Sequence, residues 1–281
     1  MIAKLNDKTG ESGIQEDGVP VYAIREVPIT TQRKPWFDIN DPKLPHPAVA
    51  RANLAPSLDT PQGSTQDNWA EKHSHQTVLQ QHCDFFDRDG DGILWPQDTY
   101  IGFYRLGLGI LFSAFAVLVI HINFSYPTSP GWLPDPYFRL FLKNVHRARH
   151  GSDTGTFDPE GRFIPAKFEE IFTKYADGRD YLTIQDLKNT LMGQRNINDP
   201  IGWCGFIFEW TATYLMLWPE DGRMMKVCSP PRGTHTRYSM LTNCLKEDIR
   251  AVYDGSIFHR IADKREKRLQ QQEQQKRQKG Q

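Results

Sequence analysis

The chain has 281 residues, and its 34 Lys and Arg balance its 34 Asp and Glu, so the formal net charge is zero. A nucleic-acid partner would need a basic face, and this balance gives no support for one. The four cysteines show no C-x-x-C spacing, and the first residues contain no apolar signal segment. We therefore expect neither a disulfide framework nor a secretory route, and a chain made on the cytosolic side.

Residues 1–70 form the first predicted region. They are rich in proline and have few apolar positions at regular spacing. This composition predicts an arm that drapes over the core or is disordered.

Residues 71–104 contain the pattern of an EF-hand. Acidic residues stand at positions 1, 3 and 5 of the loop 87–98, Gly92 permits the sharp turn at position 6, and Leu94 is the aliphatic residue at position 8. Apolar residues at helical spacing on both sides predict a helix-loop-helix. The expected calcium ligands are the carboxylates at positions 1, 3, 5 and 12 and the carbonyl at position 7: Asp87, Asp89, Asp91, Asp98 and Ile93.

Position 12 of this loop is Asp98 instead of the usual Glu. Aspartate is one methylene shorter, so it can reach the ion through one oxygen only, which shifts the preference toward Mg²⁺. The alternative is an acidic surface turn that matches the pattern by chance, and the flanking helical patterns argue against it.

Residues 105–136 are the most apolar part of the chain. An uncharged run ends at Ile122, and its length of about 17 residues is near the lower limit for a membrane span, so a span, a buried helix and a re-entrant hairpin all stay open. Pro127, Pro130 and Pro134 then force a bend, and Trp132 is of the type that favours a membrane interface. We predict an anchor on one side of a membrane or on a lipid monolayer.

Residues 137–262 are predicted to form a C-terminal helical domain. Its first segment, 137–150, has the pattern of an amphipathic helix with a basic side. Three further stretches, turning at Gly161, Asp180 and Gly222, repeat the apolar residue two places after the turn that the first EF-hand also has. They lack its ligand set. A mainly α-helical chain with one calcium loop and up to three degenerate EF-like units is therefore expected.

The fourth unit is interrupted at residues 227–246. Joining Lys226 to Glu247 would restore an acidic residue at position 12 and an exit helix in phase. We hypothesise a translated, unspliced intron, with a genuine inserted loop as the alternative. Residues 263–281 are charged and Gln-rich, which is typical of a solvated helix or a disordered tail.

Between Val78 and Ile261 the chain resembles the caleosin family of lipid-droplet calcium proteins, some of which are haem peroxygenases. The residues that carry the resemblance are Leu79-Gln80-Gln81-His82, the three prolines of the bend, His146 with His150-Gly151-Ser152-Asp153, and Asp254-Gly255-Ser256. The chain departs from the family in Asp98, in the long proline-rich arm and in the insertion.

The resemblance implies a haem b held by histidines. It points to His82 and His150 as haem-binding and catalytic residues, with His146 as a third candidate. The residues alone leave other readings open: His82 could pack in a core, and His146 with His150 could be a surface pair or half of a Zn²⁺ site. Without a C-x-x-C-H motif, any haem is bound non-covalently.

The resemblance also implies an activity: oxygen transfer from a fatty-acid hydroperoxide to an unsaturated fatty acid. His82 and His150 could both ligate the iron, or one could act as acid and base. The expected location is a lipid droplet, the endoplasmic reticulum or another intracellular membrane, and oligomers stay open. The alternative is a non-catalytic, calcium-dependent coat or tethering protein of lipid droplets.

Overall fold

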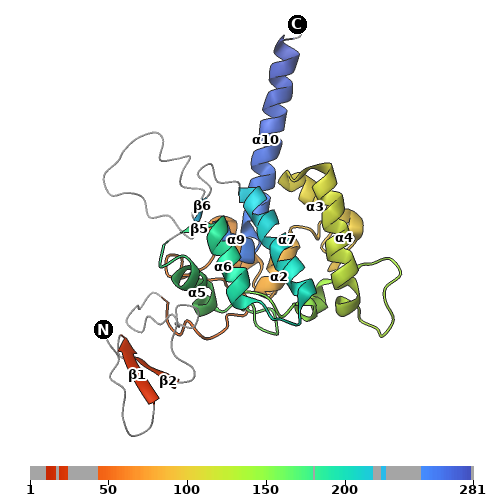
Figure 1. Cartoon of the computed structure of the whole chain (residues 1–281). Helices are drawn as coiled ribbons and strands as arrows, with labels where there is room; N and C mark the ends of the chain where they lie inside the picture. Colours follow the sequence, from red (N-terminus) through yellow and green to blue (C-terminus); the bar gives the residue numbers. More distant parts are fainter. Residues whose placement is uncertain are drawn as a thin grey trace.

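A computed structural model describes residues 11–16, 19–24, 44–179, 181–217, 223–225 and 248–279. The prediction of a mainly α-helical chain is confirmed (Figure 1). The α-helices are α1 (Trp69–Lys72), α2 (Val78–Asp84), α3 (Pro96–Leu106), α4 (Gly109–Thr128), α5 (Pro165–Tyr175), α6 (Ile184–Gln194), α7 (Pro200–Leu217), α9 (Asp248–Tyr253) and α10 (Ser256–Lys279). The 3₁₀ helices are η1 (Gln66–Asn68) and η2 (Leu142–Ala148). The strands are β1 (Glu11–Glu16), β2 (Val19–Ile24), β3 (Ile93–Leu94), β4 (Leu140–Phe141), β5 (Tyr181–Thr183) and β6 (Arg223–Met225), paired antiparallel as β1–β2, β3–β4 and β5–β6.

The acidic loop lies between α2 and α3, as its flanking patterns predict. A capping box of Thr77 and Gln80 begins α2, because each side chain bonds the backbone N–H of the other residue. Pro96 occupies the first turn of α3, where its missing N–H costs nothing, and Gly107 ends that helix with a left-handed φ of 100°. Helix-loop-helix geometry therefore follows from local signals.

α4 is the long apolar helix expected from the sequence, and it ends at the proline-rich bend. Of the residues that the structure describes, it is the one helix long and apolar enough to cross a membrane. Many of its apolar side chains face outward, and Leu111 is 86% exposed. The bend after it carries Trp132, which is 95% exposed.

The segment after the bend corrects one prediction. Residues 137–150 do not form an amphipathic helix: they form β4 and then the 3₁₀ helix η2. Two features oppose an α-helix there. Phe138 adopts a left-handed φ of 54°, and Leu140 and Phe141 pair with Leu94 and Ile93 of the acidic loop. The loop strand of the first unit thus pairs with the returning chain and not with the second unit.

The C-terminal half contains two helix–strand–helix units, α5–β5–α6 and α7–β6–α9, at the places where the sequence predicts degenerate EF-like repeats. Their strands pair through Leu182 and Met224, the apolar residues that the repeat placed at loop position 8. In the first of these units, Arg179 at loop position 5 donates to both oxygens of Asp186, at 3.0 and 2.9 Å. The suspected insertion, 227–246, lies outside the described residues.

Part of the proline-rich arm belongs to the core. Leu44, Ala55 and Ser57 are buried. The guanidinium of Arg250, in α9, donates to the Ala55 carbonyl at 3.0 Å and to the Ser64 hydroxyl at 2.9 Å. The arm is therefore bonded to α9 at Ala55 and Ser64. In contrast, most of α10 extends away from the other helices (Figure 1).

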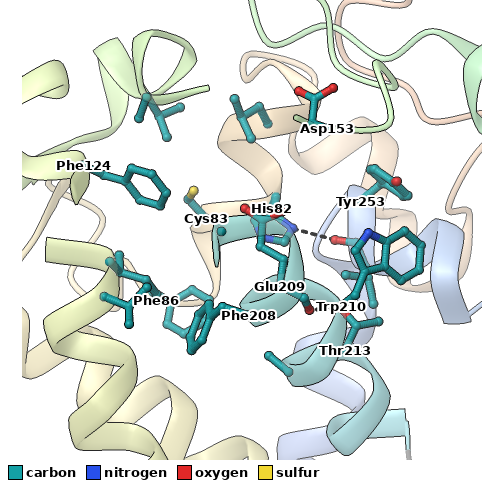
Figure 2. Close-up of a pocket in the computed structure, with 18 of the residues that line it drawn as sticks. His82, Cys83, Phe86, Phe124, Asp153, Phe208, Glu209, Trp210, Thr213 and Tyr253 are labelled. Atoms are coloured by element: carbon teal, nitrogen blue, oxygen red, sulfur yellow. Dashed lines mark hydrogen bonds between the residues drawn. The ribbon is translucent and has the colours of Figure 1, made fainter. Parts of the chain in front are cut away.

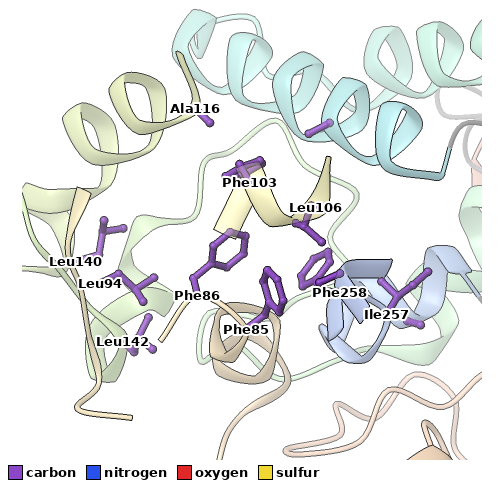
Figure 3. Packing of buried hydrophobic residues seen from close by; sticks show 13 residues of the cluster. Phe85, Phe86, Leu94, Phe103, Leu106, Ala116, Leu140, Leu142, Ile257 and Phe258 are labelled. Carbon is purple, nitrogen blue, oxygen red and sulfur yellow. The ribbon is translucent and has the colours of Figure 1, made fainter. Parts of the chain in front are cut away.

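One hydrophobic cluster joins the acidic-loop unit to the C-terminal helices. Phe85 and Phe86 at the end of α2 meet Phe103 of α3 and Phe258 of α10, with ring centroids 5.3 to 5.9 Å apart (Figure 3). Aromatic pairs at such distances add to the free energy of area burial. The cluster fixes α2, and with it His82, against the end of the chain.

Candidate functional site

A cavity of about 280 Å³ lies between α2, α3, α4, α7 and α9. Most of its wall is apolar, with Phe86, Phe103, Phe124 and Phe208 among the lining residues (Figure 2). Polar side chains also line it: His82, Arg149, His150, Asp153, Thr154, Glu209, Thr213 and Tyr253. An apolar cavity with a few polar groups is the usual form of a small-molecule site.

His82 projects from α2 into this cavity. Its Nδ1 donates to the Val252 carbonyl at 2.7 Å, because a carbonyl oxygen can only accept, so the ring presents an unprotonated Nε2 on its other side (Figure 2). Burial lowers the pKa of His82, although the Val252 bond and the charges of Glu209 and Asp254 oppose this. A neutral imidazole whose other nitrogen is held by a carbonyl is the arrangement found in metal-ligating histidines.

Gly255 allows the contact between α2 and the end of α9. It has a left-handed φ of 74°, and a Cβ there would lie 2.4 Å from the Gln81 carbonyl oxygen and 2.9 Å from the His82 Cα. A side chain larger than hydrogen would therefore push α2 away. This glycine places the Val252 carbonyl within reach of His82.

His150 lies on the same cavity, in a different setting. Its Nε2 is 3.4 Å from Oε1 of Glu209, and its Nδ1 is buried without a hydrogen-bond partner. Burial alone would lower the pKa of His150, but the hydrogen bond to Glu209 and the charges of Glu209, Asp153 and Asp199 raise it. His150 is therefore suited to hold a proton beside the cavity.

The two sequence-predicted histidines His82 and His150 are thus brought to one cavity, whereas His146 is not among the residues that line it. His146 sits on η2, one turn before the cavity-lining Arg149. The orphan Nδ1 of His150 is enclosed, so the unprotonated nitrogen of His82 is the better candidate for binding a metal from the cavity side.

Sequence analysis did not identify Glu209 or Tyr253. Burial raises the pKa of Tyr253 to about 12, and its hydroxyl lies 3.0 Å from the Thr154 hydroxyl, so it stays protonated at neutral pH. Glu209 could have been identified from the sequence, because it is the one charged residue in the apolar sequence of α7. An isolated charge in an otherwise apolar helix indicates a specific role.

The acidic loop offers a second site. One carboxylate oxygen each from Asp87, Asp89 and Asp91 lie within 4.8 Å of one another. Gly92 N–H donates to Oδ2 of Asp87 at 2.9 Å, while Oδ1 of Asp87 is buried without a partner. Burial raises the pKa of Asp87, the Gly92 bond lowers it, and the neighbouring carboxylates raise it further. A converging carboxylate set with an orphan buried oxygen suits a hard divalent cation.

Asp98, the expected ligand at position 12, has other partners in the structure. Its Oδ2 accepts from Trp95 N–H at 3.0 Å, and its Oδ1 lies 3.1 Å from the Arg88 guanidinium. Asp98 does not belong to the convergent group of three carboxylates among the described residues. For Ile93, the pairing with Phe141 fixes the backbone at the loop's exit.

The two sites share structural elements. Cys83 and Phe86, which line the cavity, lie immediately before the acidic loop, and Leu94 and Thr99, which also line it, follow the loop. The helix that carries His82 therefore leads directly into the acidic loop, and the chain that leaves the loop returns to the wall of the cavity.

Comparison with known proteins identifies the family. The family model described as caleosin related protein matches residues 74–228. The chain is 38% identical over 244 residues to a peroxygenase of Lilium longiflorum, covering 86% of this chain and 92% of the relative. It is 38% identical over 188 residues to a probable peroxygenase 4 of Arabidopsis thaliana, covering 66% of this chain and 86% of the relative. The chain belongs to the caleosin family.

A further relative carries a different name. A probable inactive peroxygenase-like protein of Arabidopsis thaliana is 31% identical over 165 residues, which cover 58% of this chain and 69% of the relative. No solved structure gives a significant match to the chain.

Proposed function

We propose that this protein is a calcium-binding haem peroxygenase of lipid droplets. It transfers one oxygen atom from a fatty-acid hydroperoxide, which leaves as the alcohol, to an unsaturated fatty acid, which becomes the epoxide or a hydroxylated product. The relatives named peroxygenase support the reaction class. The observation that carries the proposal is the 2.7 Å hydrogen bond of His82 Nδ1 to the Val252 carbonyl, because it leaves Nε2 of this cavity-lining histidine available as a ligand.

The residues at the cavity fit a haem group. His82 would hold the iron through Nε2, with the Val252 carbonyl fixing the ring and its tautomer. The aromatic wall, with Phe86, Phe124 and Phe208, would enclose a flat apolar ring system and exclude water. When bound, the haem supplies the oxygen-transfer chemistry, and the protein supplies ligation, orientation and polarity.

His150 and Glu209 would manage the proton that the reaction moves. Breaking a hydroperoxide O–O bond requires that one oxygen lose a proton and the other gain one, and a positioned acid–base group speeds such a transfer. His150 can hold that proton at Nε2, where Glu209 accepts a hydrogen bond from it at 3.4 Å. The buried phenol of Tyr253 keeps its own proton.

The acidic loop would bind one calcium ion through Asp87, Asp89 and Asp91. Its charge would relieve the repulsion of three converging carboxylates and hold the start of α3 against α2. Since α2 also carries His82, calcium would steady the haem ligand. The exposed apolar side of α4 would place the cavity at the surface of a lipid droplet or of the endoplasmic reticulum.

The test is an absorbance spectrum of protein made with a supply of haem. We expect a Soret band in the wild type and its loss in His82→Ala. The variant His150→Ala should keep most of the haem but lose oxygen transfer, measured as epoxide formed per hydroperoxide consumed. The variant His146→Ala is the matched control, because that histidine does not line the cavity, and it should keep both. A full Soret band in His82→Ala would contradict the assignment.

A second function has specific support. The relative named inactive and the exposed apolar helix α4 would suit a non-catalytic coat or tethering protein of lipid droplets. Such a protein would bind droplets without binding haem. A wild-type protein that binds droplets, takes up no haem and forms no epoxide would favour this function.

A further inference from the structure

α7 has an exposed apolar side that takes no part in the proposed reaction. Ile201, Cys204 and Ile207 are spaced by three along the helix, so they lie on one side of it, and all are exposed. Ile207 is 53% exposed. Glu209, the charged residue of this helix, lines the cavity and is also exposed, and it follows Ile207 by two residues, off the line of these three positions. The side formed by the three residues is itself uncharged.

This side continues the exposed apolar surface of α4. Phe208 lies between the two helices: its ring stacks on that of Phe112 at 5.6 Å and is 6.1 Å from that of the exposed Phe115. In Figure 1, α4 and α7 appear next to each other, as the contacts of Phe208 with Phe112 and Phe115 require. Leu118 and Ile122, further along α4, are also exposed. A lipid phase that covers the exposed side of α4 would therefore also contact α7.

Aromatic side chains mark the same end of both helices. The first turns of α7 contain Trp203, whose Nε1 donates to the Asn196 carbonyl at 2.7 Å and whose ring lies 5.4 Å from the Arg195 guanidinium. The end of α4 and the bend after it carry Tyr126 and Trp132, both exposed. Tryptophan, tyrosine and arginine favour the level where hydrocarbon meets polar headgroups. Their position at one end favours lipid over a protein as the occupant of this surface.

Phe208 connects this surface to the cavity. Its ring lines the cavity (Figure 2), and it also lies 6.1 Å from the ring of the exposed Phe115 on α4. α4 contributes Val119, Ile120 and Phe124 to the same cavity. An acyl chain lying between α4 and α7 would thus be separated from the cavity by the ring of Phe208.

We propose that α7 enters the lipid phase beside α4, and that fatty acyl chains reach the cavity from the lipid between these two helices. The inference rests on the proposed association with lipid and adds the second helix and the route of entry. The occupant of the surface is the hydrocarbon of a droplet monolayer. The substrate then never has to cross water, in which it is poorly soluble.

Cys204 is a natural reporter for this proposal. In full-length protein with Cys83, Cys228 and Cys244 changed to serine, Cys204 is labelled with the fluorophore NBD. On triolein droplets coated with phosphatidylcholine, we expect a blue shift and a rise in emission, and quenching by a doxyl group on the acyl chain. Parallel labels at Leu118→Cys in α4 and at Lys188→Cys, on the exposed side of α6, are made with Cys204 also changed to serine.

The label at 188 should stay in water and the label at 118 should enter the lipid. A label at 204 that stays in water while the label at 118 enters the lipid would overturn the proposal for α7 and leave the lipid association intact. If the labels at 204 and 118 both stay in water, the lipid association is overturned, and the proposal for α7 is overturned with it.

Entry from the lipid is tested with a charge on α7. The variant Ile207→Lys should slow the transfer of cis-parinaric acid from droplets into the haem-free protein, and should leave its uptake from dilute aqueous solution unchanged. Ile184→Lys is the matched control, because Ile184 is 62% exposed but lies on α6, and it should change neither rate. Equal transfer rates from droplets for the wild type and Ile207→Lys, or a change of equal size in both assays, would overturn the route between the helices.

Discussion

At the scale of single residues, arginine side chains neutralise carboxylates in two of the four predicted EF-like units. In the third unit, Arg179 donates to both oxygens of Asp186, and in the second, the Arg162 guanidinium lies 2.6 Å from Asp158. A guanidinium of the protein thus takes the charge-neutralising role that a cation has in an intact loop. In the first unit, Arg88 lies 3.1 Å from Asp98. The three convergent carboxylates, Asp87, Asp89 and Asp91, are separate from that pair.

Calcium affinity should therefore depend on the first unit alone. The variant Asp89→Ala removes one carboxylate of three, and we expect calorimetry to show an affinity at least about tenfold weaker, a loss of roughly 1.4 kcal/mol. Glu160→Ala, which removes an exposed carboxylate of the second unit, should leave affinity and stoichiometry unchanged. An unaltered affinity in Asp89→Ala would show that the acidic loop is not the calcium site.

A substitution at Asp98, position 12 of the acidic loop, is expected to raise calcium affinity. Asp98→Glu adds the methylene needed to reach the ion with both oxygens, so calcium affinity should rise. Asp98→Asn should lower it, because a charge is lost without a change in length. A glutamate that brings no gain in the same titration would show that position 98 prefers its contacts with Arg88 and Trp95 to the ion.

Gly255 allows a test of how His82 is placed. Gly255→Ala meets two costs: the left-handed φ of 74° and a Cβ at 2.4 Å from the Gln81 carbonyl oxygen. Gly178→Ala has the first cost only, because its φ is 73° and nothing lies within 4 Å of the added Cβ. We expect about 1 kcal/mol of destabilisation at Gly178 and at least about twice that at Gly255, measured by urea unfolding. Equal losses would mean that α2 does not pack on Gly255 as described.

At the scale of helices and strands, the elements predicted correctly are those that nearby residues in the sequence determine. The acidic loop, its two flanking helices and α4 follow from ligand spacing, caps and an uninterrupted apolar run. Residues 137–150 have the periodicity of a helix, and the prediction was wrong because pairing of β4 with β3 is a tertiary interaction that no local pattern contains.

The cavity shows the same limit. His82 and His150 were selected through a family resemblance, and the structure brings both to one cavity. Glu209 was missed because its role depends on which helices pack around the cavity, and the sequence does not show that α7 lies beside α2 there. The burial of Ala55 and Ser57 was missed as well, since proline-rich sequence without periodicity gives no sign of where a chain packs.

The proline bend can be tested as one element. Pro127 lies in the last turn of α4, and the other two prolines lie in the bend that returns the chain to β4. Changing Pro127, Pro130 and Pro134 together to leucine should extend the helix beyond Thr128 and keep β4 from reaching β3. We expect imaging to show the variant in bilayer membranes instead of droplets.

The control for this variant is Pro159→Leu, an exposed proline in a turn of the second unit. It should go to droplets as the wild type does. Unchanged droplet targeting of the triple variant would show that the exposed apolar side of α4 is sufficient and that the bend has no part in targeting.

At the scale of the whole molecule, α9 near the C-terminus contacts the helix α2 that carries His82 and the N-terminal arm. α9 supplies the Val252 carbonyl to His82 and the Arg250 guanidinium to the arm, while Asp254 accepts from the Ser64 hydroxyl at 2.7 Å. The partners in these contacts are far apart in sequence. Residues 227–246 separate β6 from α9 in the sequence, so variants of this stretch test how the placement of α9 depends on it.

Deleting residues 227–246 should give a protein at least as stable as the full chain. The deletion joins Lys226 to Glu247, so that β6, paired with β5, would be followed by α9 after an EF-type loop of ordinary length. Asp248 would then take loop position 12, and it already accepts from the Arg260 guanidinium at 2.5 Å. Shortening a loop gains only roughly 0.6 kcal/mol for each halving, so we expect Tm and haem content to be equal or slightly higher.

A variant with residues 227–246 in scrambled order is the control, because it keeps length and composition but removes any specific packing. If the segment is a retained intron, scrambling should change neither Tm nor haem content, and transcripts that skip the stretch encoding it should be found. A deletion that lowers Tm or expels haem, with a scrambled variant that does the same, would show that the segment packs on α9 and belongs to the protein. The two variants together separate the cost of a long connection from the loss of a specific contact, because only the deletion changes loop length.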